Sequence, residues 1–413
     1  MYLESLGCRL NAAELERLAR DFAGAGCTVV DGPEDADIVL LNTCAVTAQA
    51  ARKSRQRVRA LRRQSADARL AVIGCWATED EARAEGFRGV AWVIPNAEKQ
   101  RAVEIITGRV AEPAVWSPGR WGHTRAFLGV QDGCDHACTY CITRILRGPA
   151  RSRPLAEALA DVQALVAQGA REVVLSGVCL GAYGRDLGLE HGLATLVGAI
   201  LRETDVPRLR LSSVEPWDMD EPLLRHWENP RLCRQLHLPL QSGSARVLRR
   251  MGRRITPEAF AGLVSTARAI SPDIALTTDI IVGFPGETEA DFAASRDFTR
   301  RMAFARLHVF PYSERAGTPA TRLPDPVPAA IRAERAAQMR ALGVELAARY
   351  RERFVGQVLP VLWERRDQRG RWRGWTDNYL AVATETDAEL YNRITETRVL
   401  AGEGGVLVGE VVG

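Results

Sequence analysis

Cys134-Asp135-His136-Ala137-Cys138-Thr139-Tyr140-Cys141 is the stretch that decides the fold of this chain of 413 residues. Its three thiols, at spacings of four and three residues, can face one side of a cubic iron–sulfur cluster. A four-iron cluster needs four ligands, so three cysteines leave one iron open to another molecule. The motif directly follows a short apolar run at residues 127–130. The sequence therefore predicts a cluster site at the end of a buried strand.

A structural zinc site is the alternative interpretation of the same motif. Zinc normally takes a fourth Cys or His, and His136 lies inside the loop. Iron and sulfur are favoured because the motif ends a strand of a β/α repeat whose later strands also end in Gly and Ser. Zinc stays open as the second hypothesis.

The region around the motif alternates short apolar runs with helical patterns, which is typical of a β/α barrel. Two units are missing from a complete eightfold barrel, so the barrel is expected to be partial and open to a bulky substrate. The candidate strands are residues 127–130, 173–176, 209–212, 236–240, 275–282 and 305–309.

The residues before the motif form a second α/β pattern, for which we predict an open parallel sheet. Three of its apolar runs lead to cysteines, Cys8, Cys44 and Cys75. The carboxyl ends of parallel strands lie along one edge, so these thiols can converge there on a second cluster. Buried small hydrophobic cysteines would be the ordinary alternative. We interpret the remaining cysteines, Cys27, Cys179 and Cys233, as structural.

The overall fold class is α/β with three predicted domains. A Pro- and Gly-bearing stretch at residues 112–122 links the first two, and a long helical pattern at residues 328–354 precedes a tail rich in Gly, Thr and Asp. The tail is typical of a small antiparallel β barrel. The predicted boundaries are 1–115, 116–352 and 353–413.

Composition limits the function classes. Hydrophobic residues make up 46% of the chain and charged residues 26%, which excludes disordered and fibrous classes. No apolar run is long enough to cross a bilayer, and the first residues lack a signal-peptide pattern. Nine cysteines in a reducing compartment favour metal or redox chemistry over disulfides. We expect a cytoplasmic protein.

Over almost its whole length the chain resembles the methylthiotransferase family of radical S-adenosylmethionine (SAM) enzymes. The tail, which ends in Leu407-Val408-Gly409-Glu410-Val411, resembles the RNA-binding TRAM domain. The other motifs that carry the resemblance are Gly7-Cys8-Arg9-Leu10-Asn11, Asn42-Thr43-Cys44-Ala45-Val46-Thr47, Gly74-Cys75-Trp76-Ala77, Gln131-Asp132-Gly133-Cys134, Arg147-Gly148, Arg151-Ser152-Arg153, Leu240-Gln241-Ser242-Gly243-Ser244, Arg250-Met251-Gly252-Arg253-Arg254 and Asp279-Ile280-Ile281-Val282-Gly283-Phe284-Pro285-Gly286-Glu287.

The most similar branch acts on N6-threonylcarbamoyladenosine at position 37 of tRNA. Cys44-Ala45-Val46-Thr47 and Gly374-Trp375-Thr376-Asp377-Asn378-Tyr379 carry this likeness. Ser5-Leu6-Gly7-Cys8 instead resembles the branch that modifies ribosomal protein S12, and Arg144 stands where relatives usually have proline. The alternatives are action on ribosomal protein S12, action on N6-isopentenyladenosine in tRNA, and a non-catalytic RNA-binding protein with structural metal sites.

The resemblance implies two [4Fe-4S] clusters, each with three cysteine ligands: Cys134, Cys138 and Cys141 for the catalytic cluster, and Cys8, Cys44 and Cys75 for the auxiliary one. One SAM would donate a methyl group to sulfur and another would generate the radical that activates C2 of the adenine. The base would be splayed out of the anticodon loop. The expected partners are the tRNA anticodon stem-loop, a reducing electron donor and a sulfur source, with no membrane and no DNA.

Residues at the strand ends are expected to line the SAM pocket, because barrel enzymes place their sites at that face. Tyr140 stands where radical SAM proteins carry an aromatic residue beside the adenine. The other predicted SAM contacts are Ser176, Gly177, Ser213, Glu215, Gln241, Ser242, Asp279 and Gly283.

Basic clusters near aromatic residues predict contacts to RNA phosphates and bases, although a charge run is more often a solvated face. Only two of the 55 basic residues are lysines. The first cluster comprises Arg52, Lys53, Arg55 and Arg59, the second Arg147, Arg151 and Arg153, and the third Arg365, Arg366, Arg371 and Arg373 beside Trp363, Trp372 and Trp375.

Overall fold

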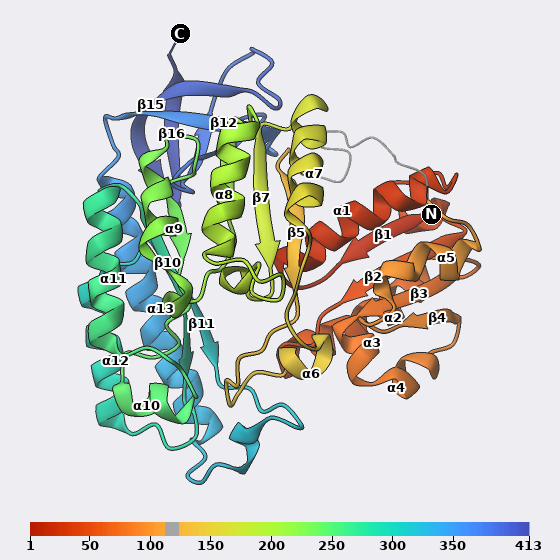
Figure 1. The fold of residues 1–413 in the computed structure, drawn as a ribbon, viewed down its shortest axis with the longest axis horizontal. Coiled ribbons are helices and arrows are strands. Elements are labelled where there is room, and N and C mark those ends of the chain that lie inside the picture. Colours follow the sequence, from red (N-terminus) through yellow and green to blue (C-terminus); the bar gives the residue numbers. More distant parts are fainter. Residues whose placement is uncertain (112–123, 413) are drawn as a thin grey trace.

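We analysed a computed structural model of the protein, which describes residues 1–111 and 124–412 (Figure 1). The predicted linker at residues 112–122 and the predicted boundary between residues 115 and 116 lie outside the described residues. None of the described helices is long and apolar enough to cross a membrane.

The N-terminal part is an open parallel sheet, as predicted. Its strands are adjacent in chain order, and β2 and β3 are buried on both faces because their residues are almost all apolar. The strands are β1 (Tyr2–Ser5), β2 (Ile38–Thr43), β3 (Arg69–Gly74) and β4 (Val90–Ile94). The helices are α1 (Arg9–Gly24), α2 (Ala48–Gln64), α3 (Cys75–Glu79), α4 (Glu81–Glu85) and α5 (Ala102–Thr107).

The central part is the predicted partial barrel. Its parallel strands follow the order of the chain, and a bridge between Ser213 and His237 joins the sheet of β8 to the sheet of β9. The strands are β5 (Ala126–Asp132), β7 (Glu172–Gly177), β8 (Arg208–Leu211), β9 (Gln235–His237), β10 (Ala275–Val282) and β11 (Arg306–Pro311), each matching one candidate strand. The sequence did not predict β6 (Arg151–Ser152), which pairs antiparallel with β5.

Helices cover the outer face of this barrel, and the apolar sides of all of them except the helix at residues 245–250 form one core with the strands. They are α7 (Leu155–Ala167), α8 (Gly192–Glu203), α9 (Glu221–Arg225), α10 (Ala245–Arg250), α11 (Pro257–Ile270) and α12 (Glu289–Met302). The predicted long helix is α13 (Ala329–Glu352), which packs against β11 and leads into the tail.

The C-terminal tail forms a closed barrel, in the order β12-β13-β14-β16-β15. The prediction of an antiparallel barrel was wrong for one pair, because β14 and β16 run parallel. The barrel has five strands in the described residues, and strand directions cannot alternate all the way round a closed ring with an odd number of strands. The strands are β12 (Val358–Arg366), β13 (Trp372–Thr376), β14 (Ala381–Thr384), β15 (Ile394–Glu403) and β16 (Val406–Val411).

Buried arginines of the central strands attach this small barrel through hydrogen bonds to its backbone carbonyls. Arg210 is fully buried, pairs with Glu172 at 2.6 Å and donates to the carbonyl oxygen of Asp377 at 2.9 Å. Arg208 donates to the carbonyl oxygen of Pro360 at 2.7 Å. In Figure 1 the small barrel lies at the top, and the arrowhead of β7 points away from it. The carboxyl ends of the strands are therefore left open for a site at the opposite end.

Candidate active site

The radical motif is a loop that leaves the end of β5 and is held by backbone contacts. Cys134 donates its N–H to the carbonyl oxygen of Gly148 at 3.1 Å, and Thr139 donates to that of Met251 at 3.0 Å. The loop ends at α6 (Thr143–Arg147). These anchors on both sides fix where the thiols point.

The loop brings its three cysteines close enough to interact. Burial raises the pKa of Cys138 to about 11, and Cys141 adds to the shift. Burial also raises the pKa of Cys141, and Cys134 contributes. The Arg253 guanidinium lies 3.9 Å from the Cys138 Sγ and 2.7 Å from Glu215. A buried cation beside the thiols favours their thiolate form, which is the form that binds iron.

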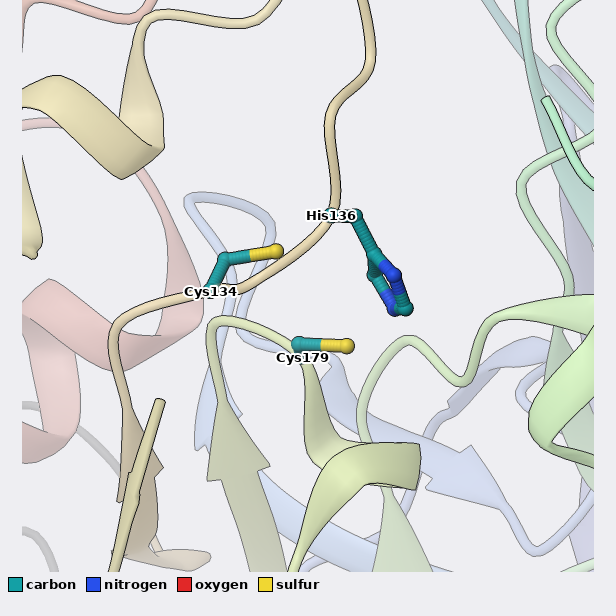
Figure 2. A group of neighbouring side chains, drawn as sticks. All are labelled: Cys134, His136 and Cys179. Atoms are coloured by element: carbon teal, nitrogen blue, oxygen red, sulfur yellow. The ribbon is translucent and has the colours of Figure 1, made fainter. Parts of the chain in front are cut away.

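Cys179 also lies at this site. It follows the end of β7, and its thiol lowers the pKa of Cys134 to about 6. The donor atoms of Cys134, His136 and Cys179 all lie within 4.8 Å of one another (Figure 2). The interpretation of Cys179 as purely structural is therefore incomplete. The sequence did contain one indication that Cys179 lies at the site: it closely follows a predicted strand, as Cys44 and Cys75 do.

The three N-terminal cysteines also converge. Cys44 follows β2, Cys75 begins α3 after β3, and Cys8 lies just before α1. Burial raises the pKa of Cys44 to about 11, and both Cys75 and Cys8 raise it further. Asn96 approaches the Cys75 Sγ at 3.6 Å and the Cys8 thiol lies 3.8 Å from Asn11. The three thiols therefore lie near one another, and their role as ligands of one cluster stays a prediction.

Arg147, predicted to contact RNA, instead joins the two parts of the molecule. The side chain is 4% exposed, so phosphates cannot reach it. It donates to Asp132 at 2.8 Å, to Glu14 at 2.9 Å and to Asn11 at 2.8 Å. The sequence showed a charge in a basic cluster, but the acidic partners lie far away along the chain. The prediction for Arg147 was wrong.

A cavity of about 160 Å³ opens between the two cysteine groups. Three of the predicted SAM contacts line it together with Cys141: Tyr140, Gln241 and Asp279. Val46 and Thr47, which directly follow Cys44 and Ala45, form its other side. The remaining lining residues are Ile142, Ile281, Phe310, Pro311, Tyr312 and Ser313.

The other predicted SAM contacts occupy different places. Glu215 is paired with Arg253, and Ser213 bridges to His237 beside it. Ser242 and Gly283 lie outside the lining of the described cavity: the Ser242 hydroxyl accepts from the N–H of Ser244, and Gly283 donates its N–H to Glu287. Gly177 closes β7 against Gln131.

Several polar atoms in this region suit a polar cofactor. The hydroxyls of Ser176 and Ser212 are buried at neighbouring strand ends with no hydrogen-bond partner among the described residues. The Tyr312 hydroxyl, which belongs to a residue of the cavity lining, has no partner there either. Buried polar groups without partners are costly in a folded chain. Together with the Cys141 thiol in the cavity lining, these atoms fit an iron–sulfur cluster and a bound SAM.

Asp279 is held by two histidines from the neighbouring strands. Its Oδ1 lies 3.3 Å from the His237 Nε2 and 3.1 Å from the His308 Nδ1. Burial opposes ionisation of Asp279, but the two hydrogen bonds outweigh it and lower its pKa. The carboxylate is therefore ionised and available to accept hydrogen bonds from a ligand in the cavity.

The basic cluster on α2 is accessible. Arg52, Lys53 and Arg59 are exposed and Arg55 is half-buried. The guanidinium of Arg59 lies over the ring of Phe87, while no ion pair holds Arg52, Lys53 or Arg55 among the described residues. The helix starts beside Val46 and Thr47, so its first turns lie next to the cavity.

The second and third basic clusters are partly occupied by acidic partners. Arg153 pairs with Asp161 at 2.8 Å, and with the exposed Arg151 it lines a cleft of about 540 Å³ between α1 and β5. In the small barrel Arg371 is 9% exposed and pairs with Glu403, and Arg373 pairs with Asp367.

The rest of the third cluster is divided between surface and core. Arg365 is exposed, and Arg366 stacks on Trp372. Trp363 and Trp372 belong to the barrel core, so the sequence-based expectation that they face RNA was wrong. Trp375 is half-buried and stacks on Tyr379.

Comparisons with known proteins agree with this architecture. Residues 1–94 match the model described as "Uncharacterized protein family UPF0004", and residues 128–299 match the radical SAM superfamily. The structure of the radical SAM methyltransferase TsrM from Kitasatospora setae, solved with cobalamin and a [4Fe-4S] cluster, aligns with a TM-score of 0.50 at 19% identity. The alignment covers 67% of this chain and 64% of TsrM, and it shows a common fold.

Relatives of known function match over nearly their whole length. Threonylcarbamoyladenosine tRNA methylthiotransferase MtaB of Bacillus subtilis is 33% identical, covering 96% of this chain and 92% of the relative. The MtaB of Thermotoga maritima is 35% identical, covering 92% and 89%. The tRNA-2-methylthio-N(6)-dimethylallyladenosine synthase of Cereibacter sphaeroides is 34% identical, covering 100% and 98%.

The partial barrel and the three cysteines after its first strand define a radical SAM enzyme, which uses SAM and iron–sulfur chemistry. The N-terminal sheet with its own cysteines and the C-terminal barrel narrow the class further. The chain belongs to the methylthiotransferase family.

Proposed function

We propose that this enzyme joins a methylthio group to C2 of N6-threonylcarbamoyladenosine at position 37 of tRNA. The observation that carries the proposal is the cavity between the two cysteine groups. Cys141 forms one side of it, and the residues just after Cys44 form the other. If C2 of the adenine is held in this cavity, it lies close to groups bound at either of the two cysteine groups. The MtaB relatives, 33–35% identical over most of the chain, support the choice of nucleoside.

The same geometry supports two [4Fe-4S] clusters, one on Cys134, Cys138 and Cys141 and one on Cys8, Cys44 and Cys75. When bound, these clusters and SAM supply the sulfur, the methyl group and the radical. Tyr140, Gln241 and Asp279 lie where they can orient SAM against Cys141. The ionised Asp279 accepts hydrogen bonds from ribose hydroxyls or from the amino group of SAM.

Side chains at the cavity and on the neighbouring helix α2 can bind the RNA substrate. Phe310 lines the cavity and is 41% exposed, so its ring can stack on a base turned out of the anticodon loop. Thr47, Tyr312 and Ser313 add hydroxyls that can bind the base edge or its N6 substituent. Arg52, Lys53 and Arg55 on α2 are placed to bind the flanking phosphates. We also infer an electron donor, a sulfur source and a cytoplasmic location, the setting in which tRNA is modified.

A second candidate substrate is the dimethylallyl form of adenosine. Relatives such as the Cereibacter sphaeroides enzyme carry that name, and apolar side chains such as Val46, Ile142 and Ile281 line the cavity. A dimethylallyl group is apolar, whereas the threonylcarbamoyl group carries a carboxylate.

Mass spectrometry of tRNA nucleosides from a deletion strain tests the proposal. We expect loss of 2-methylthio-N6-threonylcarbamoyladenosine, with the unmethylthiolated nucleoside accumulating in its place. The wild-type gene should restore it, and a Cys134→Ala variant should not. Loss of the dimethylallyl product would assign the second substrate. If both nucleosides were unchanged and ribosomal protein S12 lost a methylthio group, the tRNA assignment would be wrong.

A further inference from the structure

The side chains of Cys134, His136 and Cys179 form a compact group of metal-binding donors. Cys134 and His136 come from the loop after β5, and Cys179 comes from the loop after β7 (Figure 2). Figure 2 shows both sulfur atoms and the imidazole ring facing a common space. One donor atom from each residue lies within 4.8 Å of the other two.

Asp218 adds an oxygen to the same group. Its Oδ2 lies 3.7 Å from the His136 Nε2 and 3.7 Å from the Cys179 Sγ. Its Oδ1 accepts from Arg185 at 2.6 Å, which orients the carboxylate. The side chain of Asp218 is fully buried and Cys179 is 2% exposed. Two sulfurs, one nitrogen and one oxygen thus surround a common space, in which Cys179 and Asp218 are buried and Cys134 and His136 are half-buried.

Charge also favours a cation here. Once both thiols are deprotonated by a bound ion, two thiolates and the Asp218 carboxylate would carry three negative charges, of which Arg185 compensates one. A divalent ion with a neutral imidazole would neutralise the remainder. Thiolates are soft ligands and imidazole is an intermediate one, so the set suits Zn²⁺ rather than Mg²⁺ or Ca²⁺.

The spacing distinguishes a single ion from a cluster. Zinc binds sulfur at roughly 2.3 Å and nitrogen at roughly 2.0–2.1 Å, so donors arranged tetrahedrally on one ion lie about 3.4–3.8 Å from each other. The donor atoms of Cys134, His136 and Cys179 lie within 4.8 Å of one another, so they need to approach by at most about 1 Å to bind one tetrahedral ion. In a cubic cluster each thiolate sits on a different iron and must lie farther from its neighbours. Cys179 is thus too close to Cys134 to be a further cluster ligand.

We propose that the cluster-free chain binds one Zn²⁺ through Cys134, His136 and Cys179, with Asp218 as the fourth ligand. Binding releases to water the thiol protons that the two cysteines still hold and changes no oxidation state. Cys134 cannot serve the ion and the catalytic cluster together, so the two states exclude each other. Zinc at this site therefore acts as a competitor of cluster insertion.

Cobalt(II) is the probe, because tetrahedral thiolate coordination gives it visible absorption. The full-length chain is prepared free of iron, with Cys8, Cys27, Cys44 and Cys75 changed to Ala so that only the central part of the molecule offers thiolates. We expect one tightly bound Co²⁺ per chain, displaced by Zn²⁺. Cys179→Ala should weaken binding by more than about 100-fold, and Asp218→Asn by roughly 10–100-fold. The matched variant Cys138→Ala should bind as well as the parent.

The second measurement varies the order in which zinc, iron and sulfide are added. It also tests whether Cys179→Ala is folded, because a folded variant can still form the cluster. Zinc added before iron and sulfide should block the cluster absorbance in the parent chain and not in Cys179→Ala, which retains all three cluster cysteines. Equal Co²⁺ binding by Cys179→Ala and the parent would overturn the proposal. So would loss of binding in Cys138→Ala, because the ion would then lie among the three motif cysteines.

Discussion

At the scale of single residues, two glycines each fix the position of the cysteine that follows them. Gly74 and Gly133 directly precede Cys75 and Cys134, and both have positive φ, +93° and +71°. An added Cβ would lie 2.5 Å from the Asn42 side chain at Gly74 and 1.9 Å from the Pro149 carbonyl oxygen at Gly133. A side chain at either position must therefore push the following cysteine away from its group.

We predict that these two glycines control different clusters. Gly133→Ala should abolish iron at the catalytic cluster and spare the auxiliary one, and Gly74→Ala should do the reverse. The strained backbone and the clash each cost about 1–3 kcal/mol, enough to displace a loop. Iron and sulfide content after reconstitution, with spectra of the two clusters, measures the effect.

Gly262→Ala is the matched control for both glycine variants. Gly262 lies inside α11 with no atom within 4 Å of an added Cβ, so iron content should match that of the wild type. If Gly133→Ala and Gly74→Ala lost the same cluster, the division into two independent cysteine groups would be contradicted.

Glu14 is the residue on which the contact between the N-terminal sheet and α6 depends. Burial alone would raise the pKa of Glu14, but Lys99 and Arg147 outweigh it and bring the pKa from 4.5 to about 2. We predict that Glu14→Gln lowers the free energy of unfolding at neutral pH by about 3–5 kcal/mol, because two cations lose their buried partner. Urea titration measures the change.

The pH dependence of this contact has a definite sign. A carboxyl with a depressed pKa in the folded state stabilises fully above its usual value of 4.5, and the stabilisation is lost as the pH falls toward 2. The difference between wild type and Glu14→Gln should therefore shrink as the pH drops below 4.5. Glu104→Gln, which removes an exposed pair with Arg101, should change stability little. A constant difference at all pH values would contradict the assignment.

The sequence indicates which cysteines could act as cluster ligands, and this stays a prediction, but it indicates their surroundings poorly. Cys134, Cys138 and Cys141 are close in the chain, so their spacing carries the information. Arg147 and Cys179 depend on partners from distant segments, Glu14 and Cys134 respectively, and no local pattern reports those contacts. The RNA role predicted for Arg147 failed for this reason.

At the scale of elements, long apolar strands were predicted closely because burial on both faces leaves an uninterrupted hydrophobic run. β10 spans Ala275–Val282, the same residues that the pattern indicated. β6 has only two residues, Arg151 and Ser152, and no periodicity can identify so short a strand. Tertiary pairing with Gln131 and Asp132 creates it.

The start of α2 is the element that we expect to hold RNA phosphates. Thr47 caps the helix by accepting from the N–H of Ala50 at 3.1 Å, and this turn lines the cavity. We predict that replacing Arg52, Lys53 and Arg55 with Ala weakens binding of an anticodon stem-loop and reduces the salt dependence of its affinity. Each lost phosphate contact should lower the slope of log K against log salt by about 0.7–0.9.

Arg63 provides the control on the same helix. It is exposed in the last turn of α2, roughly 17 Å along the helix from Arg52 at 1.5 Å per residue. Arg63→Ala should leave the salt slope nearly unchanged. Equal effects of the two changes would indicate non-specific attraction to a charged helix rather than a defined contact.

At the scale of the whole molecule, the active site and the small C-terminal barrel lie at opposite ends of the central barrel. The cysteine motif lies at the carboxyl ends of the strands. Arg208 and Arg210 of β8 instead contact the small barrel. Their partner Glu172 is the first residue of the neighbouring strand β7, so these contacts lie at the amino ends. The eight residues of β10 alone span on the order of 25 Å. One tRNA must therefore extend along the protein to touch both ends.

This separation predicts a difference between short and complete RNA ligands. Arg365 and Arg369 are exposed on the small barrel, and Arg369 has only a weak, solvent-exposed pair with Glu403. The double variant Arg365→Ala/Arg369→Ala should weaken binding of full-length tRNA while leaving the affinity for an isolated anticodon stem-loop unchanged. The α2 variant should weaken the binding of both RNAs, because its residues lie beside the cavity.

Affinities measured for the two RNAs at several salt concentrations distinguish these cases. Removal of a phosphate contact lowers the salt slope only for the RNA that makes that contact. Weaker stem-loop binding by the small-barrel variant would mean that the loop is bound at the amino ends of the strands, and the placement of the base between the two cysteine groups would then be wrong.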